Sequence, residues 1–486
     1  MTASRPRVSS DRPRKKTLFI FRRDLRLRDN SGLIGALRDA GSVIPCFIFD
    51  PRQSGDHPYK SDSALQFLIT SLVELDRELR ARGSHLYLFQ GEAEKVVSSL
   101  IRSEGLDGVC VDRDYTPFSR RRDAAIRLAC RLENAAFDSC DDALLNEPEA
   151  VAKADGKPYL VFTPFFNASR ILPVRRPQEN PSTNYYAARI ASETGGAVYD
   201  RVLPRRNVRL YRKGGRTEAL GILGKMGGFT DYEKTRDVPA LERTTGLSPH
   251  SKFGTISIRE FHWTVRKRLG PGHPLLRQLY WRDFFTHIAS RFERVFGRPF
   301  RPDFERLPWA DDPGRLRRWR EGTTGFPIVD AGMRQLNSTG FMHNRVRMIC
   351  ASFLVKDLHI DWRAGERYFA TKLEDYDPCV NNGNWQWVAS TGCDAAPYFR
   401  IFNPWLQQKR YDPDALYIKR WVPELKKAAS EAIHRMDRAE GRPPGGYPSP
   451  MVDHAAESVR ALALYRSVKP AAGKGRSTRA LSVRRG

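Results

Sequence analysis

Residues 374–387, EDYDPCVNNGNWQW, bring together three kinds of side chain that can do chemistry. Asp375 and Asp377 supply carboxylates, Asn381 supplies an amide, and Trp385 and Trp387 supply indole rings. Carboxylates and amides can bind the polar groups of a ligand, and indoles offer flat apolar surfaces for stacking. Such a run is unusual within a helical pattern and marks a candidate binding site.

Two shorter segments have related features. In RQLYWRDFF, residues 277–285, a helix would place Gln278 and Trp281 three apart on one face, either as ordinary packing or as the floor of a pocket. In GFMHNRVRM, residues 340–348, a helix would place Asn344 and Met348 on one face and turn Arg347 aside. A buried arginine needs a carboxylate partner.

The segment TTGLSPHSKFGTIS, residues 244–257, is rich in hydroxyls near a predicted helix start. Its hydroxyls and backbone amides could hold a diphosphate, although alone it is more typical of an ordinary helix cap and loop. Together the four segments predict a large, polar-lined aromatic cofactor pocket with a second aromatic cleft beside it.

The elements that must position these residues begin with an α/β pattern. The short apolar runs TLFIF, VIPCFIF, LYLFQ and GVCVD alternate with segments of helical periodicity, which predicts an α/β domain over residues 17–145 with a parallel, five-stranded, Rossmann-like sheet. FRRDLRLRDN follows the first predicted strand, where such folds place ligand-binding loops. It lacks a Gly-rich phosphate fingerprint, so no ordinary dinucleotide site is expected there.

The rest of the chain divides into four regions. Residues 146–228 are rich in Pro and Gly and predict a long connector, and residues 229–466 predict an all-α domain that holds most of the tryptophans. Residues 1–16 and 467–486 are expected to be a disordered basic arm and a disordered basic tail.

Charge and composition narrow the function classes. The formal net charge is +26, which predicts a polyanionic partner, nucleic acid first. Seven cysteines without C-x-x-C or zinc spacing predict reduced thiols in an intracellular protein and no metal site, although four of them could meet around an iron–sulfur cluster. No apolar run is long enough to span a membrane.

Four stretches resemble the photolyase/cryptochrome family, and most of all its class I cyclobutane pyrimidine dimer (CPD) photolyases. They are LFIFRRDLRLRDN, LSPHSKFGTISIRE, TGFPIVDAGMRQLNSTGFMHNRVRM and NNGNWQWVASTGCDAAPYFRIFNP. The resemblance covers roughly residues 17–425 and implies that the helical domain binds FAD.

The resemblance also implies roles for individual residues around FAD. Tyr232, Thr244 and Ser248 match positions that hold the phosphates and ribitol. Arg347 and Asp375 match an ion pair beside the isoalloxazine, and Asp377 matches an acid near the flavin edge. Asn381 matches the residue that faces flavin N5, where photolyases of this kind carry Asn, plant cryptochromes Asp and animal cryptochromes Cys.

Three tryptophans match the electron-transfer chain of the family. Trp385 would lie next to the flavin, Trp362 would follow, and Trp309 would lie near the surface. Without the resemblance, three core tryptophans would be the simpler interpretation.

The resemblance also implies a substrate cleft and the residues that line it. Trp281 and Trp387 match two aromatic walls around the dimer, and Asn344 and Met348 match lining residues. The implied reaction begins when the lesion flips out of the duplex. Light then excites reduced FAD, one electron enters the cyclobutane ring, two C–C bonds break, and the electron returns. This makes the expected enzyme a deoxyribodipyrimidine photo-lyase acting on damaged DNA.

Gln278 departs from the CPD pattern, because most class I enzymes carry Glu there. (6-4) photolyases carry Gln at this point, but they have two catalytic histidines at the positions of Asn344 and Met348. We weigh the two missing histidines above one amide and expect CPD repair. A cryptochrome-like blue-light receptor and a (6-4) photolyase are the alternatives, and a DNA-binding protein that has lost its cofactor is a further one.

The family also carries an antenna chromophore, a folate or a deazaflavin, in its N-terminal domain. VDRDYTPFSRRRD, residues 111–123, lies where the family contacts it, but Thr116 stands near the position of the acid that folate binders use, so the antenna stays open. We expect a monomer that is cytoplasmic and nucleoid-associated in a prokaryote, or nuclear or organellar in a eukaryote.

Overall fold

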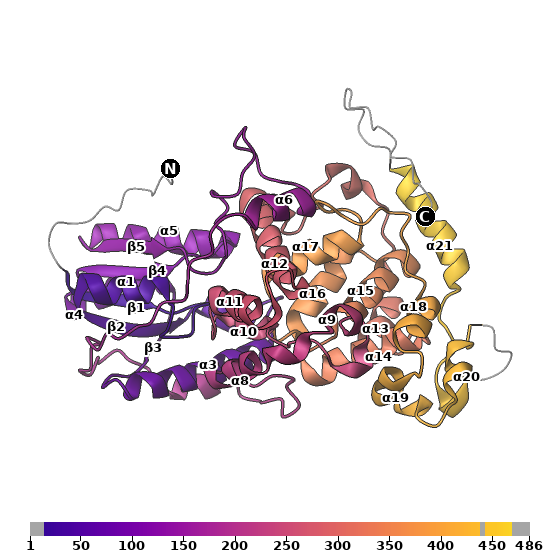
Figure 1. Cartoon of the computed structure of the whole chain (residues 1–486), viewed down its shortest axis with the longest axis horizontal. Coiled ribbons are helices and arrows are strands. Elements are labelled where there is room, and N and C mark those ends of the chain that lie inside the picture. The colour runs from indigo at the N-terminus through magenta and orange to yellow at the C-terminus, as the bar shows by residue number, and fades with distance from the viewer. Residues whose placement is uncertain (1–13, 438–442, 469–486) are drawn as a thin grey trace.

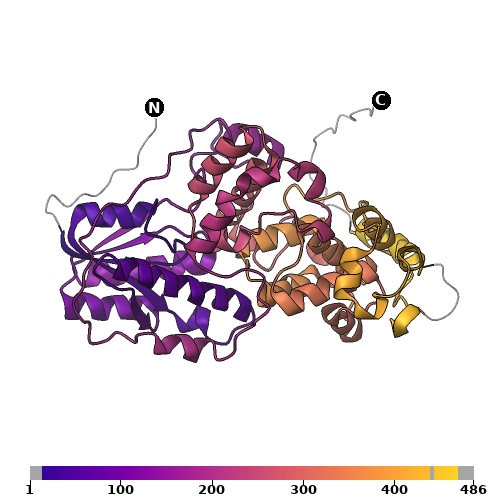
Figure 2. The same cartoon turned by 60° about the horizontal axis from the view of Figure 1, so that its bottom comes forward.

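The structure is a computed structural model that describes residues 14–437 and 443–468. An α/β domain and a helical domain lie side by side along the long axis (Figure 1), and the view turned by 60° shows the same division (Figure 2). Residues 1–13 of the predicted basic arm and residues 469–486 of the predicted tail lie outside the described residues.

The α/β domain is built on one parallel sheet, as predicted. Its strand order is β3-β2-β1-β4-β5. The strands are β1 Arg14–Ile20, β2 Ala40–Phe49, β3 Tyr87–Gln90, β4 Gly108–Asp112 and β5 Ala136–Cys140. Because β1 begins at Arg14, residues 14–16 belong to the sheet and not to the basic arm in which the sequence placed them.

Helices cover both faces of this sheet. The helices of the domain are α1 Ser31–Asp39, α2 Pro51–Ser54, α3 Asp62–Arg80, α4 Ala93–Glu104 and α5 Pro117–Leu132. Side chains alternate along a strand, so Phe19 and Phe21 of β1 pack with α1 and α3, whereas Leu18 and Ile20 pack with α4 and α5. The two resulting cores explain why β1 to β4 each contain an apolar run.

The connector between the domains is largely irregular. It contains α6 Phe162–Ser169, α7 Ala197–Val202 and α8 Arg216–Gly224. Its residue Tyr185 forms an isolated bridge to Val43 of β2. At this point the connector runs beside β2 in the plane of the sheet, before it enters the helical domain.

The second domain is helical, as predicted. Its α-helices are α9 Tyr232–Thr235, α10 Ser248–Phe253, α11 Ile258–Leu269, α12 Pro274–Arg291, α13 Pro313–Glu321, α14 Pro327–Thr339, α15 Asn344–Ser352, α16 Trp362–Lys372, α17 Pro378–Val388, α18 Pro404–Tyr411, α19 Leu416–Trp421, α20 Ser430–His434 and α21 His454–Ser467. A π-helical turn, Phe353–Asp357, follows α15. No helix among the described residues is long and apolar enough to cross a membrane.

Asp283 fixes α12 to the beginning of the connector. Its carboxylate is fully buried and accepts hydrogen bonds from the backbone amides of Leu145, at 2.9 Å, and Asn146, at 3.4 Å. Burial raises the pKa of Asp283 to about 7, although Arg282 and the two amides act in the opposite direction.

Asp283→Asn is expected to remove a pH dependence of stability. The unfolded chain releases this proton near pH 4 and the folded chain near pH 7, so the folded state binds more protons between these values. The free energy of unfolding of the wild type should therefore fall relative to that of the variant as the pH rises through this window, by up to ~4 kcal/mol. Denaturant unfolding of both proteins at pH 4, 5.5 and 8 measures this, and parallel profiles would contradict it.

Candidate functional site

Helix α17 lies at the centre of the predicted site and packs against α12, α15 and α16. It carries Asn381, Trp385 and Trp387. The neighbouring α12 carries Gln278 and Trp281, α15 carries Asn344, Arg347 and Met348, and α16 carries Trp362. The structure thus brings residues from four separate sequence segments to adjoining helices.

Asp377 determines where α17 begins. One of its carboxylate oxygens accepts hydrogen bonds from the backbone amides of Cys379, at 3.0 Å, and Val380, at 3.2 Å, and Pro378 occupies the first helical position. The other oxygen pairs with the guanidinium of Arg23, from the loop after β1. Burial alone would raise the pKa of Asp377, but Arg23 and Lys252 lower it to about 2. Both oxygens of this expected flavin-edge acid are therefore engaged by the protein.

Arg347 and Asp375 form the ion pair expected at the flavin. Nη2 of Arg347 lies 2.9 Å from Oδ2 of Asp375, and its Nε donates to the backbone oxygen of Met342 at 2.8 Å. Oδ1 of Asp375 is buried and has no hydrogen-bond partner among the described residues. A buried acceptor of this kind needs a donor, which a bound ligand can supply.

The side-chain amide of Asn381 has a defined orientation. Its nitrogen donates to the backbone oxygen and to Oε1 of Glu366, each at 3.1 Å. Because a backbone oxygen can only accept, the nitrogen must face Glu366 and the amide oxygen must face away. Burial raises the pKa of Glu366 to about 7, and the bond from Asn381 opposes this. The sequence did not single out Glu366, whose only local signal is a polar residue on the buried face of α16.

The three tryptophans of the expected electron-transfer chain differ in burial. Trp385 and Trp362 are members of one apolar core, and Trp309 is half-buried at its margin. The ring of Trp309 meets that of Tyr465 in α21 edge-on, with the centroids 6.3 Å apart. Gly365 lets α16 approach closely, because a Cβ there would lie 2.2 Å from Cη2 of Trp385.

The residues expected to line the substrate cleft are half-buried or exposed. Trp281 and Trp387 are both half-buried, and Phe162 of α6 stacks on Trp281 with centroids 3.6 Å apart and planes within 6°. Nδ2 of Asn344 lies 3.8 Å from Sδ of Met348, as their helical spacing predicts. The side-chain amide of Gln278 makes no hydrogen bond to any other described residue. Phe162 was missed by the sequence reasoning, because its contact with Trp281 is made across the fold.

The comparisons with known proteins cover nearly the whole chain. A model described as DNA photolyase matches residues 17–182, and one described as the FAD binding domain of DNA photolyase matches residues 275–467. A deoxyribodipyrimidine photo-lyase from Agrobacterium fabrum is 37% identical over 92% of this chain and 97% of the relative. The chain belongs to the DNA photolyase/cryptochrome family.

Solved structures of the family have the same fold. An archaeal photolyase from Sulfolobus tokodaii, with two FAD molecules, is 44% identical, with a TM-score of 0.85 over 93% of this chain and 100% of that chain. A cryptochrome from Synechocystis sp. PCC6803 is 28% identical, with a TM-score of 0.85 over 93% of this chain and 99% of that chain. The prediction of an FAD-binding helical domain is confirmed.

The residues of this photolyase-family domain fit a flavin nucleotide. Thr244 is half-buried and Ser248 is exposed at the start of α10, and their hydroxyls make no hydrogen bond to other described residues. Tyr232 is buried, with its ring centroid 6.0 Å from that of His273. These hydroxyls and the unpartnered Oδ1 of Asp375 are the polar groups that a ribitol and a diphosphate can use.

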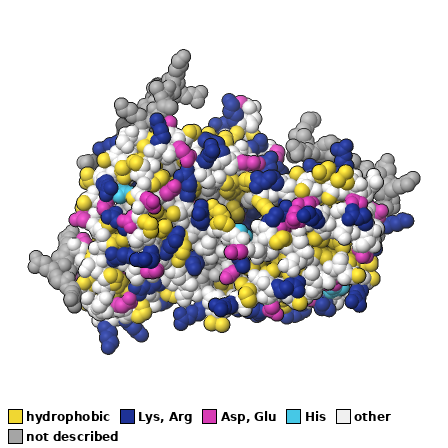
Figure 3. Space-filling view, turned by 180° about the vertical axis from the view of Figure 1, so that it is seen from behind, with side chains coloured by type: hydrophobic (Ala, Val, Ile, Leu, Met, Phe, Trp, Pro, Cys, Tyr) yellow, Lys and Arg dark blue, Asp and Glu magenta, His cyan; other side chains and the backbone are white. Residues whose placement is uncertain are grey.

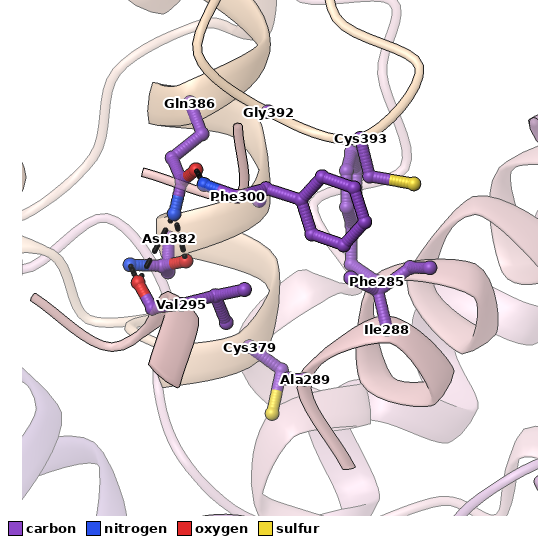
Figure 4. A pocket seen from close by; sticks show the side chains of 11 residues that line it. Phe285, Ile288, Ala289, Val295, Phe300, Cys379, Asn382, Gln386, Gly392 and Cys393 are labelled. Atoms are coloured by element: carbon purple, nitrogen blue, oxygen red, sulfur yellow. Dashed lines mark hydrogen bonds between the residues drawn. The ribbon is translucent and has the colours of Figure 1, made fainter. Parts of the chain in front are cut away.

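A small cavity on another side of α17 is not this cofactor site. It has a volume of about 20 Å³ and contains none of the predicted site residues (Figure 4). The amides beside it hold the protein together, because Nε2 of Gln386 donates to Oδ1 of Asn382 at 3.0 Å and both amides donate to the backbone oxygen of Val295. This cavity has room for about one water molecule.

The α/β domain offers no free phosphate site at the start of α1. The amides of Ser31 and Gly32 donate to the carboxylates of Asp142 and Asp112, at 3.1 and 3.0 Å. The chain thus fills with its own acids the place where a Rossmann fold binds a diphosphate. Thr116 caps α5 by accepting from the amide of Ser119 at 3.1 Å, which gives it a structural role at the position considered for an antenna contact.

Among residues 14–437 and 443–468, no group of three or more His, Cys, Asp or Glu side chains could hold a metal. All seven cysteines are free thiols. Six are buried and Cys140 is partly exposed.

Proposed function

We propose that this protein repairs cyclobutane pyrimidine dimers in DNA in a light-dependent reaction with reduced FAD. The observation that carries the proposal is the pair Asn344 and Met348, which lie in contact on one face of α15, Asn344 exposed and Met348 half-buried. Relatives of nearly the same length are named deoxyribodipyrimidine photo-lyase, which supports the same conclusion.

The absence of histidine from this face favours CPD repair over (6-4) repair. The adjacent His343 is buried, and its Nδ1 accepts from the amide of Arg345 at 3.2 Å to cap α15. Burial lowers the pKa of His343 to about 4, so it is neutral at physiological pH and is used structurally. It therefore does not replace the acid and base that a (6-4) enzyme carries here.

Each residue of the site has a role in this proposal. When bound, reduced FAD supplies the electron that opens the cyclobutane ring. Asn381, whose amide nitrogen is held by Glu366, would present its oxygen as a neutral acceptor to N5. The pair Arg347–Asp375, with its charges compensated, would hold the ring system. Asp377 acts through α17 by fixing its first turn.

The cleft residues bind the lesion. Trp281 and Trp387 stack on the extruded dimer, and the free amide of Gln278 donates a hydrogen bond to a pyrimidine oxygen. Trp385, Trp362 and Trp309 pass an electron inward from the surface, which restores the reduced state. A second chromophore is consistent with the two FAD molecules of the Sulfolobus tokodaii structure.

A cryptochrome-like blue-light receptor is the second candidate. Gln278 in place of the usual Glu and the fold shared with the Synechocystis cryptochrome favour it. Such a receptor would be photoreduced but would leave lesions intact.

The decisive experiment offers thymine oligomers with one CPD or one (6-4) lesion to the chemically reduced protein under blue light. We expect loss of the CPD only, measured by chromatography of the oligomer, and no loss in the dark. Intact CPDs after illumination of a flavin-loaded protein would refute the proposal.

Trp385→Phe is expected to lower the rate of photoreduction of the oxidised flavin at least tenfold, because phenylalanine is not oxidised under these conditions. Repair by the chemically reduced variant should keep the wild-type rate. Trp319→Phe is the matched control, since Trp319 is equally buried and its ring lies 6.2 Å from that of Trp385 but is outside the proposed chain. Normal photoreduction by Trp385→Phe would remove Trp385 from the chain.

Gln278→Glu is expected to leave the CPD repair rate unchanged or to raise it, because the carboxyl group restores the residue usual in CPD enzymes. Gln278→Ala removes the hydrogen bond and should lower the rate several-fold. Single-turnover repair at saturating substrate measures both. A sharp fall in the Glu variant would mean that the amide itself is adapted to this enzyme.

A further inference from the structure

The ring of Phe162 covers one face of Trp281, the expected cleft wall on α12. The two rings are almost parallel, with planes within 6° and centroids 3.6 Å apart, which is van der Waals contact. Phe284 and Phe285 of the same helix are further away, with centroids 5.7 and 5.5 Å from that of Trp281. Among the described residues, Phe162 thus makes the closest ring contact with this wall. It is itself 1% exposed, whereas Trp281 is half-buried.

Phe162 comes from the connector and not from the helical domain. It is the first residue of α6, which lies against α12 (Figure 1). The sequence supplies no local cap for α6, because Val161 at the N-cap position has an apolar side chain. Oδ2 of Asp394 accepts from the backbone amide of Phe162 at 2.9 Å instead. A residue 232 positions away therefore fixes the point from which the ring of Phe162 projects.

Asp394 belongs to the loop that follows the second expected wall. This loop comes after α17, which carries Trp387, and the amide of Ala396 donates to the backbone oxygen of Trp387 at 3.1 Å. The thiol of Cys393 donates to the backbone oxygen of Leu160 at 2.7 Å. The loop is thus joined to the start of α6 by two hydrogen bonds and to Trp387 by a third.

These contacts form one continuous path between the two walls. The path runs from Trp387 through the loop to Asp394. From there it passes to Phe162, whose ring rests on Trp281. Asp394 has a φ of +48°, a left-handed conformation that Asp tolerates better than most residues. The relative position of the walls therefore depends on a side chain, Phe162, that is too buried to touch a lesion itself.

We propose that Phe162, held by Asp394, is a positioning residue that fixes the indole plane of Trp281 relative to Trp387, so that the cleft binds a joined dimer in preference to an undamaged base. This inference rests on the proposed function, because it takes the two tryptophans as walls around a dimer. A wall that is fixed before binding loses little freedom when it stacks on a ligand. Basic and acidic side chains are interspersed over the face shown in Figure 3, and contacts to phosphates do not distinguish bases, so discrimination must come from the walls.

The first test replaces Phe162 by Leu, which keeps an apolar side chain but removes the flat ring. Phe165→Leu is the matched control. Phe165 lies in the same helix, is 2% exposed and meets the rings of Phe284 and His287, but it makes no ring contact with Trp281 among the described residues. FAD content and photoreduction of the flavin should equal those of the wild type in both variants.

Phe162→Leu should bind a single-stranded CPD oligomer about tenfold more weakly in the dark, because the wall no longer has a fixed plane. The single-turnover repair rate at saturating oligomer should stay within about twofold of the wild-type rate, since the electron donor is untouched. Binding of undamaged DNA should not change. Phe165→Leu should match the wild type in all three measurements.

The second test changes Asp394 and leaves every aromatic ring in place. Asp394→Gly removes the carboxylate, and Gly accepts the left-handed backbone. Asp394→Asn keeps an oxygen that can accept from the amide of Phe162, and Asn also tolerates this conformation. We expect several-fold weaker CPD binding by Asp394→Gly and nearly wild-type binding by Asp394→Asn. Equal losses in the two variants would show an effect of the charge alone and would contradict the role of this hydrogen bond.

The position of Trp281 can also be measured without a substrate. In protein labelled with 5-fluorotryptophan, the fluorine resonance of Trp281, assigned by Trp281→Phe, should shift or broaden in Asp394→Gly and keep its wild-type form in Asp394→Asn. An unchanged resonance in Asp394→Gly, or equal losses of CPD binding in the two Leu variants, overturns the inference even if the wild type repairs CPDs. A changed resonance in a protein that neither binds nor repairs CPDs would support the positioning of Trp281 and refute the proposed function.

Discussion

The pairing of Asp377 with the first turn of α17 and with Arg23 is the interaction on which the site depends. The same carboxylate begins the helix and joins it to the loop after β1 of the other domain. Every residue that α17 presents is placed from this point by helical spacing. Because the carboxylate is buried, removing Arg23 would leave it without its ion-pair partner, which is more costly than losing a surface ion pair. Asp377 therefore fixes both the contact between the two domains and the positions of the site residues along α17.

Helix α17 uses its sides for different purposes. Asn381 is held by Glu366 of α16, and Trp385 packs into the core where Gly365 admits it. Asn382 and Gln386, one residue further along, bind Val295 and so fix the segment that follows α12. A polar residue of α17 is thus either a candidate for binding a ligand or a residue that holds neighbouring segments together, depending on the side of the helix on which it lies. This is why the run NNGNWQW combines residues of the site with residues of the scaffold.

The sequence predicts the fold well where local pattern and burial agree. β1 to β4 are buried on both faces and their apolar runs are plain, but β5, AFDSC, is half-exposed at the sheet edge and has no such run. In the site, helical spacing places Asn344 with Met348, and the resemblance to photolyases pairs the half-buried Arg347 with Asp375. Glu366 and Phe162 could not be found in this way. Their partners are separated from them by 15 and 119 residues, and only the fold brings them together.

Charge is distributed differently in the cleft and around it. The residues that would touch a lesion are neutral, since Gln278, Asn344, Met348 and the tryptophans carry no charge, and Arg347 is compensated by Asp375. A neutral cleft does not attract undamaged backbone, so selection there must come from stacking, shape and the ease of extruding a damaged base. Attraction to DNA would then come from the basic surface of a chain whose formal net charge is +26. Because of this separation, the affinity for DNA would depend on the salt concentration. Discrimination between lesions would not, because counterion release affects all duplexes alike.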